Sequence, residues 1–246
     1  MKENEELMQR IAALEDHYWW YTGRRKILKK VFGRFLSGDR KVLNIGCGTG
    51  GDSLCARTFA EVFNTDYSLS ALVFNRSKGN TRHFRADCLE LPVKSSIFDM
   101  VLCLDVLEHL EDDERAVAEI SRVLAPGSGR LLVTVPALGW LWTSRDEVEE
   151  HFRRYSKPSL EALLRKAGFG IIFSSYFNTL LFPLTLLDCL LDRWRRTRCP
   201  EYSFPDPGKA FNLLLQEMLA FERHFIPRPG LPFGKSLICL CRTLRG

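Results

Sequence analysis

Residues 41–51 read KVLNIGCGTGG, and this segment decides the fold. Its apolar residues predict a strand over 42–46, and a helix is predicted over 51–60. A glycine turn between a strand and a helix is typical of a site in which a nucleotide cofactor lies over the helix N-terminus. A chain uses many glycines where its backbone approaches another group closely, and the junction holds Gly46, Gly48, Gly50 and Gly51.

An acidic residue supports a nucleotide site. Asp66 ends the next predicted strand, 20 positions after Gly46, where a carboxylate can accept hydrogen bonds from ribose hydroxyls. The glycines themselves leave the cofactor open. GCGTGG (46–51) matches the G-x-G-x-x-G of dinucleotide sites and also G-x-G-x-G, which suits S-adenosylmethionine. A plain tight turn without any cofactor is the third alternative.

The rest of the chain alternates between predicted strands and helices, which indicates βαβ units. The strand cores are continuous apolar runs, as expected when helices cover both faces of a sheet. We therefore predict an α/β fold: a Rossmann-like, doubly wound, seven-stranded and mostly parallel sheet. The predicted strands are 42–46, 61–66, 82–87, 98–105, 130–136, 170–177 and 236–244, and the helices between them are 51–60, 69–78, 112–124 and 159–167.

Two regions depart from this alternation. Residues 1–36 are predicted to form an N-terminal helical lid, with the aromatic stretch HYWWY at 17–21. Residues 178–232 form an insertion before the last strand, a predicted helical cap whose amphipathic helices, 179–194 and 209–224, are expected to pack on each other. The remaining residues, 37–177 and 233–246, form the predicted cofactor-binding core.

Composition bounds the class of protein. The 246 residues are 46% hydrophobic and 26% charged, as in ordinary globular proteins. The net charge of +5 is too small to predict stable nucleic-acid binding. The eight cysteines show no C-x-x-C pair, which favours a reducing compartment. The acidic N-terminus has no signal-peptide pattern, and the apolar stretch 180–191 is shorter than the roughly 20 residues of a membrane span. We predict a cytoplasmic protein.

From about residue 17 onward, the sequence resembles the class I S-adenosylmethionine-dependent methyltransferases, particularly the group typified by small-molecule and quinone-type methyltransferases. The resemblance rests on VLNIGCGTG (42–50), NTDYS (64–68) and the long run from Arg85 to Pro136. In that run, an apolar strand ends in DVLEHL (105–110), and a helix and a proline-glycine turn lead into the next apolar strand. The resemblance implies a methyltransferase whose cofactor is S-adenosylmethionine.

The resemblance also implies roles for the matching residues. Arg24, behind the aromatic stretch of the lid, would meet the methionine carboxylate, although helix packing is an alternative role for this segment. Asn44 is a departure, because the family often has an acid there, yet an amide can still accept a hydrogen bond. The other implied contacts are Gly46, Cys47, Gly48 and Gly50 to the methionine portion, Asp66 to the ribose hydroxyls with Tyr67 beside the adenine, Asp87 and Cys88 to the adenine edge, and Leu104 and Asp105 to the floor near the sulfonium.

Methyl transfer from a sulfonium is an in-line displacement, so the protein must align the acceptor and remove a proton from a hydroxyl. Asp105, Glu108 and His109 form D-x-x-E-H at the end of a predicted strand, and His109 is a candidate base. Alternatively, Glu108 and His109 only fix the loop by hydrogen bonds. A similar set binds a divalent metal in some relatives, but we predict no metal here.

A second candidate cluster lies within residues 140–169. A related group of these methyltransferases carries H-D and then G-H-x-R-R-Y in this region. By that likeness, Asp146 and His151 form an orienter and a base, and Arg153 or Arg154 clamps an anionic acceptor. A capping and salt-bridge network is the alternative. The departures are Arg145, where that group has its first His, and Glu150, where it has Gly.

The acceptor is predicted to be a small molecule, lipid or sugar that is methylated at oxygen. Residues 179–198 join an apolar helix to a basic end, so they are a candidate for peripheral membrane contact and for receiving a lipid-linked acceptor. Three alternatives stay open: an RNA methyltransferase, a nicotinamide enzyme and a catalytically silent cofactor-binding protein. The sequence leaves the oligomeric state open.

Overall fold

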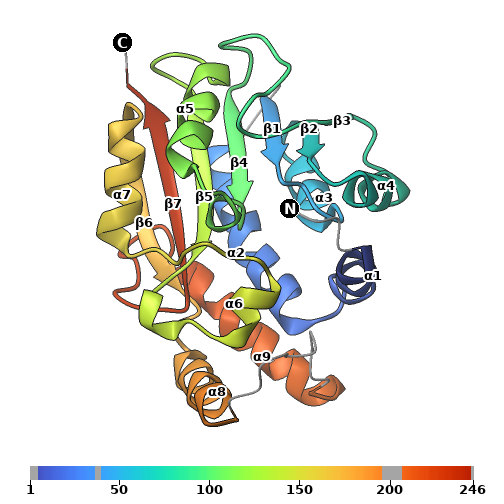
Figure 1. The fold of residues 1–246 in the computed structure, drawn as a ribbon, viewed down its shortest axis with the longest axis vertical. Coiled ribbons are helices and arrows are strands. Elements are labelled where there is room, and N and C mark those ends of the chain that lie inside the picture. Colours follow the sequence, from blue (N-terminus) through green and yellow to red (C-terminus); the bar gives the residue numbers. More distant parts are fainter. Residues whose placement is uncertain (1–4, 37–39, 196–206, 245–246) are drawn as a thin grey trace.

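The computed structural model describes residues 5–36, 40–195 and 207–244, and the fold is built on a seven-stranded sheet of order β3-β2-β1-β4-β5-β7-β6 (Figure 1). This sheet confirms the predicted fold class. Several predicted elements are longer than the observed ones, and the largest differences are in the helix observed at 51–57, the third strand at 83–85 and the fourth strand at 100–104. The strands are β1 (Lys41–Ile45), β2 (Glu61–Asp66), β3 (His83–Arg85), β4 (Met100–Leu104), β5 (Arg130–Pro136), β6 (Phe169–Phe177) and β7 (Ser236–Thr243).

The first five strands run parallel, and β7 is antiparallel to both β5 and β6. Chain order leads from β1 outward to β3 and then returns to β4 beside β1, so the strand order reverses between β1 and β4. Ligands of open α/β sheets bind at such a switch point, beyond the carboxyl ends of the strands.

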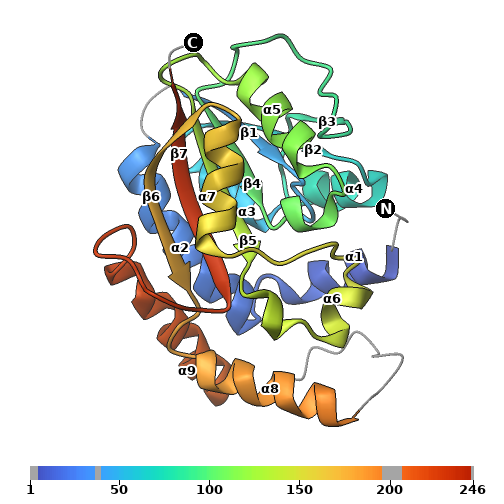
Figure 2. The ribbon, with the colours of Figure 1, turned by 60° about the vertical axis from the view of Figure 1, so that its left-hand side comes forward.

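Helices cover both faces of the sheet, as Figures 1 and 2 show. Successive side chains in a strand point to opposite faces. In β1, Val42 accordingly packs into a core with α2, while Leu43 packs into a core with α5 and α7. The helices are α1 (Glu5–Leu14), α2 (Trp19–Phe35), α3 (Gly51–Arg57), α4 (Leu69–Ser77), α5 (Asp113–Val123), α6 (Ser144–Val148), α7 (Lys157–Lys166), α8 (Phe182–Arg195) and α9 (Lys209–Phe221), with 3-10 turns η1 (Leu107–His109), η2 (Gly139–Leu141) and η3 (Glu222–His224).

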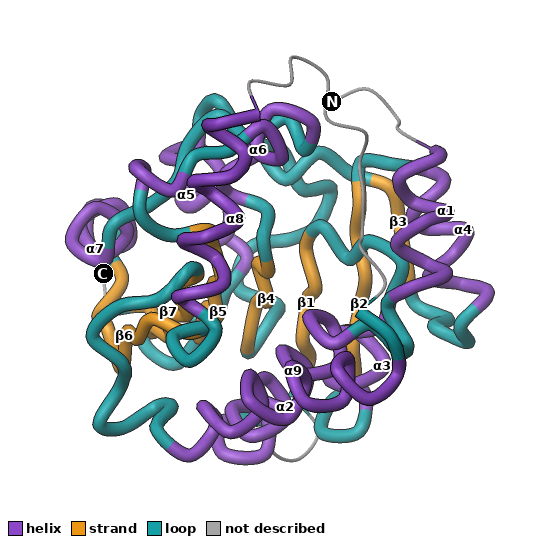
Figure 3. The backbone as a smooth tube through the Cα atoms, turned by 90° about the horizontal axis from the view of Figure 1, so that it is seen from below, coloured by secondary structure: helices purple, strands orange, loops and turns teal. Residues whose placement is uncertain are grey.

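The N-terminal region has two parts. The second half of α2 is a core helix, because Ile27, Val31 and Phe32 are almost completely buried against the sheet. Only α1 and the first turns of α2 border the carboxyl ends of the strands, and Figure 3 looks onto this edge with α1 and α6 on different sides of it. The division of the chain into lid, core and cap stays a prediction, and residues 1–4, 37–39, 196–206 and 245–246 of those segments lie outside the described residues.

The insertion differs from its predicted packing. Helix α9 packs principally against α2, where the Asn212 side chain accepts a hydrogen bond from the Trp19 amide (2.9 Å) and donates one to the His17 carbonyl (2.8 Å). The predicted packing of the two amphipathic helices on each other is therefore at most a minor contact. Helix α8 is instead anchored at its start, where three consecutive backbone amides, from Asn178 to Leu180, donate to the buried Glu222 carboxylate.

Candidate active site

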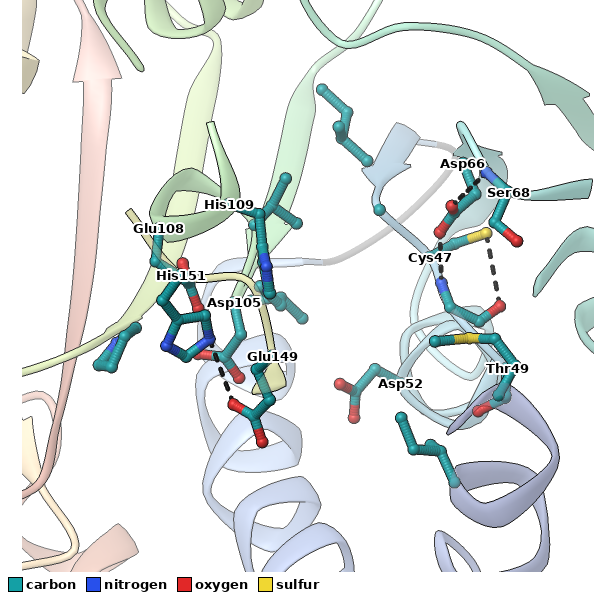
Figure 4. A pocket seen from close by; sticks show the side chains of 18 of the residues that line it. Cys47, Thr49, Asp52, Asp66, Ser68, Asp105, Glu108, His109, Glu149 and His151 are labelled. Atoms are coloured by element: carbon teal, nitrogen blue, oxygen red, sulfur yellow. Dashed lines mark hydrogen bonds and ion pairs between the residues drawn. The ribbon is translucent and has the colours of Figure 1, made fainter. Parts of the chain in front are cut away.

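A cavity of about 690 Å³ opens beyond the carboxyl ends of β1, β2 and β4. Its volume is within the range of sites that enclose a cofactor or a drug-sized ligand, roughly 300–1,000 Å³. Every residue that the sequence assigned to cofactor binding or catalysis lines this cavity. Figure 4 shows residues that line the cavity in two groups, with Cys47, Asp52 and Asp66 on one side and Asp105, His109 and His151 on the other. The structure thus brings the predicted residues together, while their roles stay predictions.

The glycine loop is shaped by close approach. Gly46 has a φ of +62°, and a Cβ atom there would lie 2.4 Å from Cγ2 of Val106. Gly50 has a φ of +97°, and a Cβ atom there would meet the side chains of Asn75 and Asn80 at 3.0 Å or less. A side chain is thus excluded at both positions by the backbone conformation and by the neighbours. Gly48, between them, has open space where a Cβ would lie, which is the room that a cofactor needs.

Asp66 holds this loop in place. Its Oδ2 accepts the Gly48 amide and its Oδ1 accepts the Ser68 amide, both at 2.9 Å. Burial raises the pKa of Asp66, although these backbone amides oppose the shift. Each carboxylate oxygen has a second lone pair, so Asp66 fits the predicted contact with ribose hydroxyls. Tyr67 beside it is 45% exposed and lies under the Arg85 guanidinium.

Arg24 crosses from the lid into the cavity. Its guanidinium is paired with Asp52 at 2.8 Å and with Asp105 at 3.0 Å. Arg24 is 7% exposed, and its Nε is buried without a hydrogen-bond partner among the described residues. An orphaned donor in a cavity is a feature that a ligand carboxylate can satisfy. Asp105 is held at a φ of +56°, with its Oδ1 accepting the Thr134 hydroxyl at 3.0 Å.

A second lid contact was not predicted from the sequence. Glu15, at the end of α1, is 5% exposed and accepts the Gly51 amide at the N-terminus of α3 at 3.1 Å. Lys78 of α4 pairs with the same carboxylate at 2.7 Å. A carboxylate is stabilised at a helix N-terminus, so this contact ties the lid to the glycine loop. One acidic residue in an acidic N-terminal helix gives no signal of such a role.

The two candidate histidines contact each other, with ring centroids 4.7 Å apart and planes at 72°. His151 Nδ1 lies 2.8 Å from Asp146 Oδ1, and His151 Nε2 lies 3.2 Å from Glu149 Oε2. Asp146 is also held by two guanidinium nitrogens of Arg154, at 2.8 and 2.9 Å. The expected contact between Asp146 and His151 is present, within the salt-bridge network that the sequence left as the alternative.

The two histidines differ in charge. Burial lowers the pKa of His151, but its hydrogen bonds to Asp146 and Glu149 outweigh burial and raise it to about 9. Burial and the neighbouring charge of His151 lower the pKa of His109. At neutral pH, His151 is therefore a cation and His109 is neutral, so His109 is the histidine that can accept a proton. Burial and Asp105 raise the pKa of Glu108 well above its ordinary value.

Glu108, His109 and His151 each offer a ligand atom, and these atoms lie within 4.8 Å of one another. Carboxylate and imidazole are suitable ligands for a divalent metal. Both ring nitrogens of His151 are instead directed at carboxylates, so the described arrangement is a hydrogen-bonded cluster. Independence from metal stays a prediction.

Of the two arginines predicted to clamp an anionic acceptor, only Arg154 lines the cavity. Arg153 does not line the cavity; it pairs with Asp113 at 3.0 Å and donates to the Glu111 carbonyl at 2.7 Å. Arg154 lines the cavity but is engaged by Asp146. The departure at position 44 is also accounted for, because Asn44 lies behind the cavity wall and donates to Ser53 Oγ at 2.8 Å.

Three further residues of the acceptor side were not assigned from sequence: Arg145, Glu149 and Lys235. Lys235 comes from the loop before β7, far along the chain from the other site residues, so no spacing pattern could have found it. Arg145 and Glu149 flank Asp146 on α6, a five-residue helix that was not predicted. Its capping box, formed by Thr143 and Asp146, is the signal that sequence analysis could have used.

Comparison with known proteins identifies the family. Residues 43–133 match the model of a methyltransferase domain. A Methanocaldococcus jannaschii protein of uncharacterized function is 33% identical over 162 residues, which cover 64% of this chain and 69% of that protein. A Mycobacterium tuberculosis protein named "Probable S-adenosylmethionine-dependent methyltransferase" is 32% identical over 163 residues, which cover 65% of this chain and only 58% of that relative.

Among solved structures, a chain of the complex that contains the Haloferax volcanii Trm112 methyltransferase activator matches with a TM-score of 0.66 and 18% identity, over 99% of this chain and 97% of that chain. At 18% identity, this match shows only that the two chains share a fold. The sheet order, the glycine loop and the matched domain agree with one another. This chain carries a methyltransferase domain of the class I S-adenosylmethionine-dependent kind, and it spans about 58% of the length of the named relative.

Proposed function

We propose that this chain transfers the methyl group of S-adenosylmethionine to an oxygen of a small acceptor. One observation carries the proposal: His109, which is neutral at neutral pH, lies in the same cavity as the glycine loop, next to the end of β4. S-adenosylmethionine, when bound, supplies an electrophilic methyl group. An alcohol or phenol acceptor must lose its proton as that methyl is attacked, and a neutral imidazole is the group suited to take it.

The chain's own residues divide this work. The glycine loop would contact the methionine portion and Asp66 the ribose, and Arg24 would offer the methionine carboxylate its Nε, which has no partner among the described residues. Leu104 and Asp105 line the cavity and would form its floor near the sulfonium. The positive charge of His151 lowers the pKa of His109, which keeps the base unprotonated, and Asp146 fixes His151 in place.

Two relatives support oxygen as the target. An Amycolatopsis mediterranei relative, 32% identical over 151 residues (54% of each chain), is named 27-O-demethylrifamycin SV methyltransferase. An Aspergillus nomiae relative, 27% identical over 162 residues (59% of this chain and 72% of that protein), is named an O-methyltransferase. Both names describe those proteins, and they favour an organic hydroxyl as the acceptor class here.

Calorimetric titration with S-adenosylmethionine and with NAD tests the first step. We expect the protein to bind S-adenosylmethionine and not NAD. Binding of NAD together with no binding of S-adenosylmethionine would refute the proposal. Release of S-adenosylhomocysteine is then measured against a panel of hydroxylated amphiphiles, with transfer RNA as the comparison. Turnover on RNA but on no amphiphile would favour the RNA methyltransferase alternative.

We propose further that the acceptor is reached at a membrane surface through α8. Four large apolar side chains with helical spacing are exposed on it: Leu184 (48%), Leu187 (53%), Leu190 (53%) and Trp194 (81%). Exposed Arg193 lies in the last turn of α8, where it donates to the Trp140 carbonyl, and the sequence continues with Arg195, Arg196 and Arg198. An apolar face with a basic end is typical of helices that lie in the interface of an anionic membrane. Residues 196–198 of the predicted contact lie outside the described residues.

None of the helices in the described part of the chain has the length and apolar character needed to cross a membrane. Flotation with vesicles of phosphatidylglycerol and phosphatidylcholine tests the surface contact. We expect the Leu187→Gln, Leu190→Gln double variant to lose binding to anionic vesicles. Val73→Gln, at a residue of α4 that is 60% exposed, is the matched control. Equal flotation of the wild type and the double variant would exclude α8 as the contact.

A further inference from the structure

Two cations on the acceptor side of the cavity lack a partner. Arg145 of α6 and Lys235 of the loop before β7 both line the cavity and are partly buried. Within residues 5–36, 40–195 and 207–244, neither charged group makes an ion pair or a hydrogen bond. A partly buried charge without a partner is costly in the absence of a ligand, so this pair calls for an explanation.

The other basic side chains of the cavity are engaged. Arg24 is shared between Asp52 and Asp105, and Arg154 forms its fork with Asp146. Around the acceptor side, the cations that line the cavity are Arg145, His151, Arg154 and Lys235, and the acidic residues are Glu108, Glu111, Asp146, Glu149 and Glu150. His151 and Arg154 are engaged by Asp146 and Glu149, so Arg145 and Lys235 are the two cations of this side without a partner among the described residues.

The environment of Lys235 places two other cations near its amine. Burial, and then the charges of Arg145 and Arg154, lower the pKa of Lys235 to about 8, while Glu149 and Asp188 oppose the shift. A desolvated cation beside two other cations is disfavoured without a ligand and is relieved by an anion. Perturbed titratable groups of this kind concentrate at ligand sites.

An aromatic cluster continues from these cations toward α8. The ring centroids of Trp140 and Phe182 are 6.0 Å apart, and those of Phe182 and Phe233 are 5.3 Å apart. Trp140 is 51% exposed and Phe233 is 46% exposed. Phe233 precedes Lys235 by two residues, so an apolar surface outside the cavity begins close to Lys235. A ligand with an anionic head and an apolar chain fits this arrangement, with its head at the two cations and its chain along the aromatic rings.

We infer that Arg145 and Lys235 form an anion subsite for the acceptor, and that the acceptor carries a phosphate group on an apolar chain. Two unpaired cations match the charge of a phosphate monoester, which is near −2 at neutral pH, roughly −1.5 to −2. Arg binds such a group through its fork and Lys through a point charge. The inference rests on the proposed methyl transfer and adds the class of the acceptor.

Titration calorimetry at pH 7 in the presence of S-adenosylhomocysteine tests it, with octyl phosphate and octyl glucoside as probes. We expect the wild type to bind octyl phosphate in preference to octyl glucoside. Arg145→Met and Lys235→Met should each weaken octyl phosphate binding by about 10-fold or more, as expected for a lost charged hydrogen bond. Affinity for S-adenosylhomocysteine should not change in these variants. Arg165→Met and Lys166→Met, on the exposed face of α7, are matched controls.

The results separate the inference from the proposed function. Failure of the wild type to bind S-adenosylmethionine would refute the methyltransferase proposal itself. Cofactor binding without preference for octyl phosphate, or with equal octyl phosphate affinity in the Arg145→Met, Lys235→Met double variant, would refute only the anion subsite. Recovery of binding in Arg145→Lys and Lys235→Arg, together with competition by inorganic phosphate, would support recognition of the head group. Binding that inorganic phosphate cannot displace would show that the alkyl chain alone is recognised.

Discussion

The two halves of the cavity are built in different ways (Figure 4). The cofactor half consists largely of backbone: a glycine loop, the ends of adjacent parallel strands, and one carboxylate, Asp66, that binds loop amides. The buried cation of this half, Arg24, forms ion pairs with Asp52 and Asp105. The acceptor half consists of side chains from η1, α6, the segment after α6 and the loop before β7, and two of its cations have no partner within the described part of the chain. The first half follows from the sheet and its loops, whereas the second depends on side chains that tertiary packing brings together.

The two halves of the cavity also differ in how they affect the stability of the fold. In the cofactor half, packing and hydrogen bonds stabilise the same conformation that the ligand needs, so stability and function agree. In the acceptor half, unpaired charge lowers stability, which is the usual trade-off at a functional site. Replacement of an unpaired cation of the acceptor half should therefore raise stability, whereas substitutions in the cofactor half should lower it.

The largest effect is expected for Gly46→Val. The new Cβ would lie 2.4 Å from Val106 at a φ of +62°, so the loop must move away from its bond with Asp66. Overpacking and the left-handed backbone together should lower the free energy of unfolding by about 2–5 kcal/mol. Binding of S-adenosylmethionine should be abolished in calorimetric titration. Gly139→Ala is the control, because that glycine has open space and no positive φ. Retention of tight binding by Gly46→Val would show that the loop is not the cradle.

The next largest effect is expected for His109→Ala. Loss of a general base should reduce kcat by about 10²–10⁴-fold, with the affinity for S-adenosylmethionine unchanged. Because the pKa of His109 is lowered from 6.5, the wild-type rate should rise with pH to a plateau that begins below neutrality. The variant should lack this rise, whereas His224→Ala, at a histidine outside the cavity, should keep it. An unchanged pH profile in His109→Ala would assign the proton transfer to another group.

The same contrast explains what the sequence could predict. The strand and helix pattern around GCGTGG, with Asp66 after the next strand, depends on local spacing, so the sheet and the cofactor half could be predicted. Lys235 and Glu15 enter the cavity from opposite ends of the chain, and only tertiary packing places them there. The packing of α8 was also predicted wrongly. The spacing of its apolar residues indicates an apolar face, but it does not indicate whether another helix covers that face. Sequence favoured neither His109 nor His151, since the charges that separate them come from Asp146 and Glu149.

A moderate effect on stability is expected at His151. Its pKa in the folded protein is raised from 6.5 to about 9, so its contribution is fully present below pH 6.5 and is lost as the pH rises through about 9. We expect this contribution to be about 2 kcal/mol. Urea unfolding at pH 7 and pH 10 should show a larger loss of stability in the wild type than in His151→Gln. Equal losses would mean that the Asp146 network does not stabilise the charged imidazole.

The smallest effect, and the one of opposite sign, is expected for Lys235→Met. The pKa of Lys235 is lowered from 10.5 to about 8, so its charge destabilises the fold below pH 8, and this penalty disappears as the pH rises toward 10.5. Because the side chain is only partly buried, we expect the variant to be more stable by about 1 kcal/mol at pH 7 and equal to the wild type above pH 10.5. Urea unfolding at the two pH values measures this, with Lys166→Met as the control. A variant that is both more stable at pH 7 and unable to bind octyl phosphate would show that the lysine is retained for its ligand, and a less stable variant would mean that it is retained for the fold.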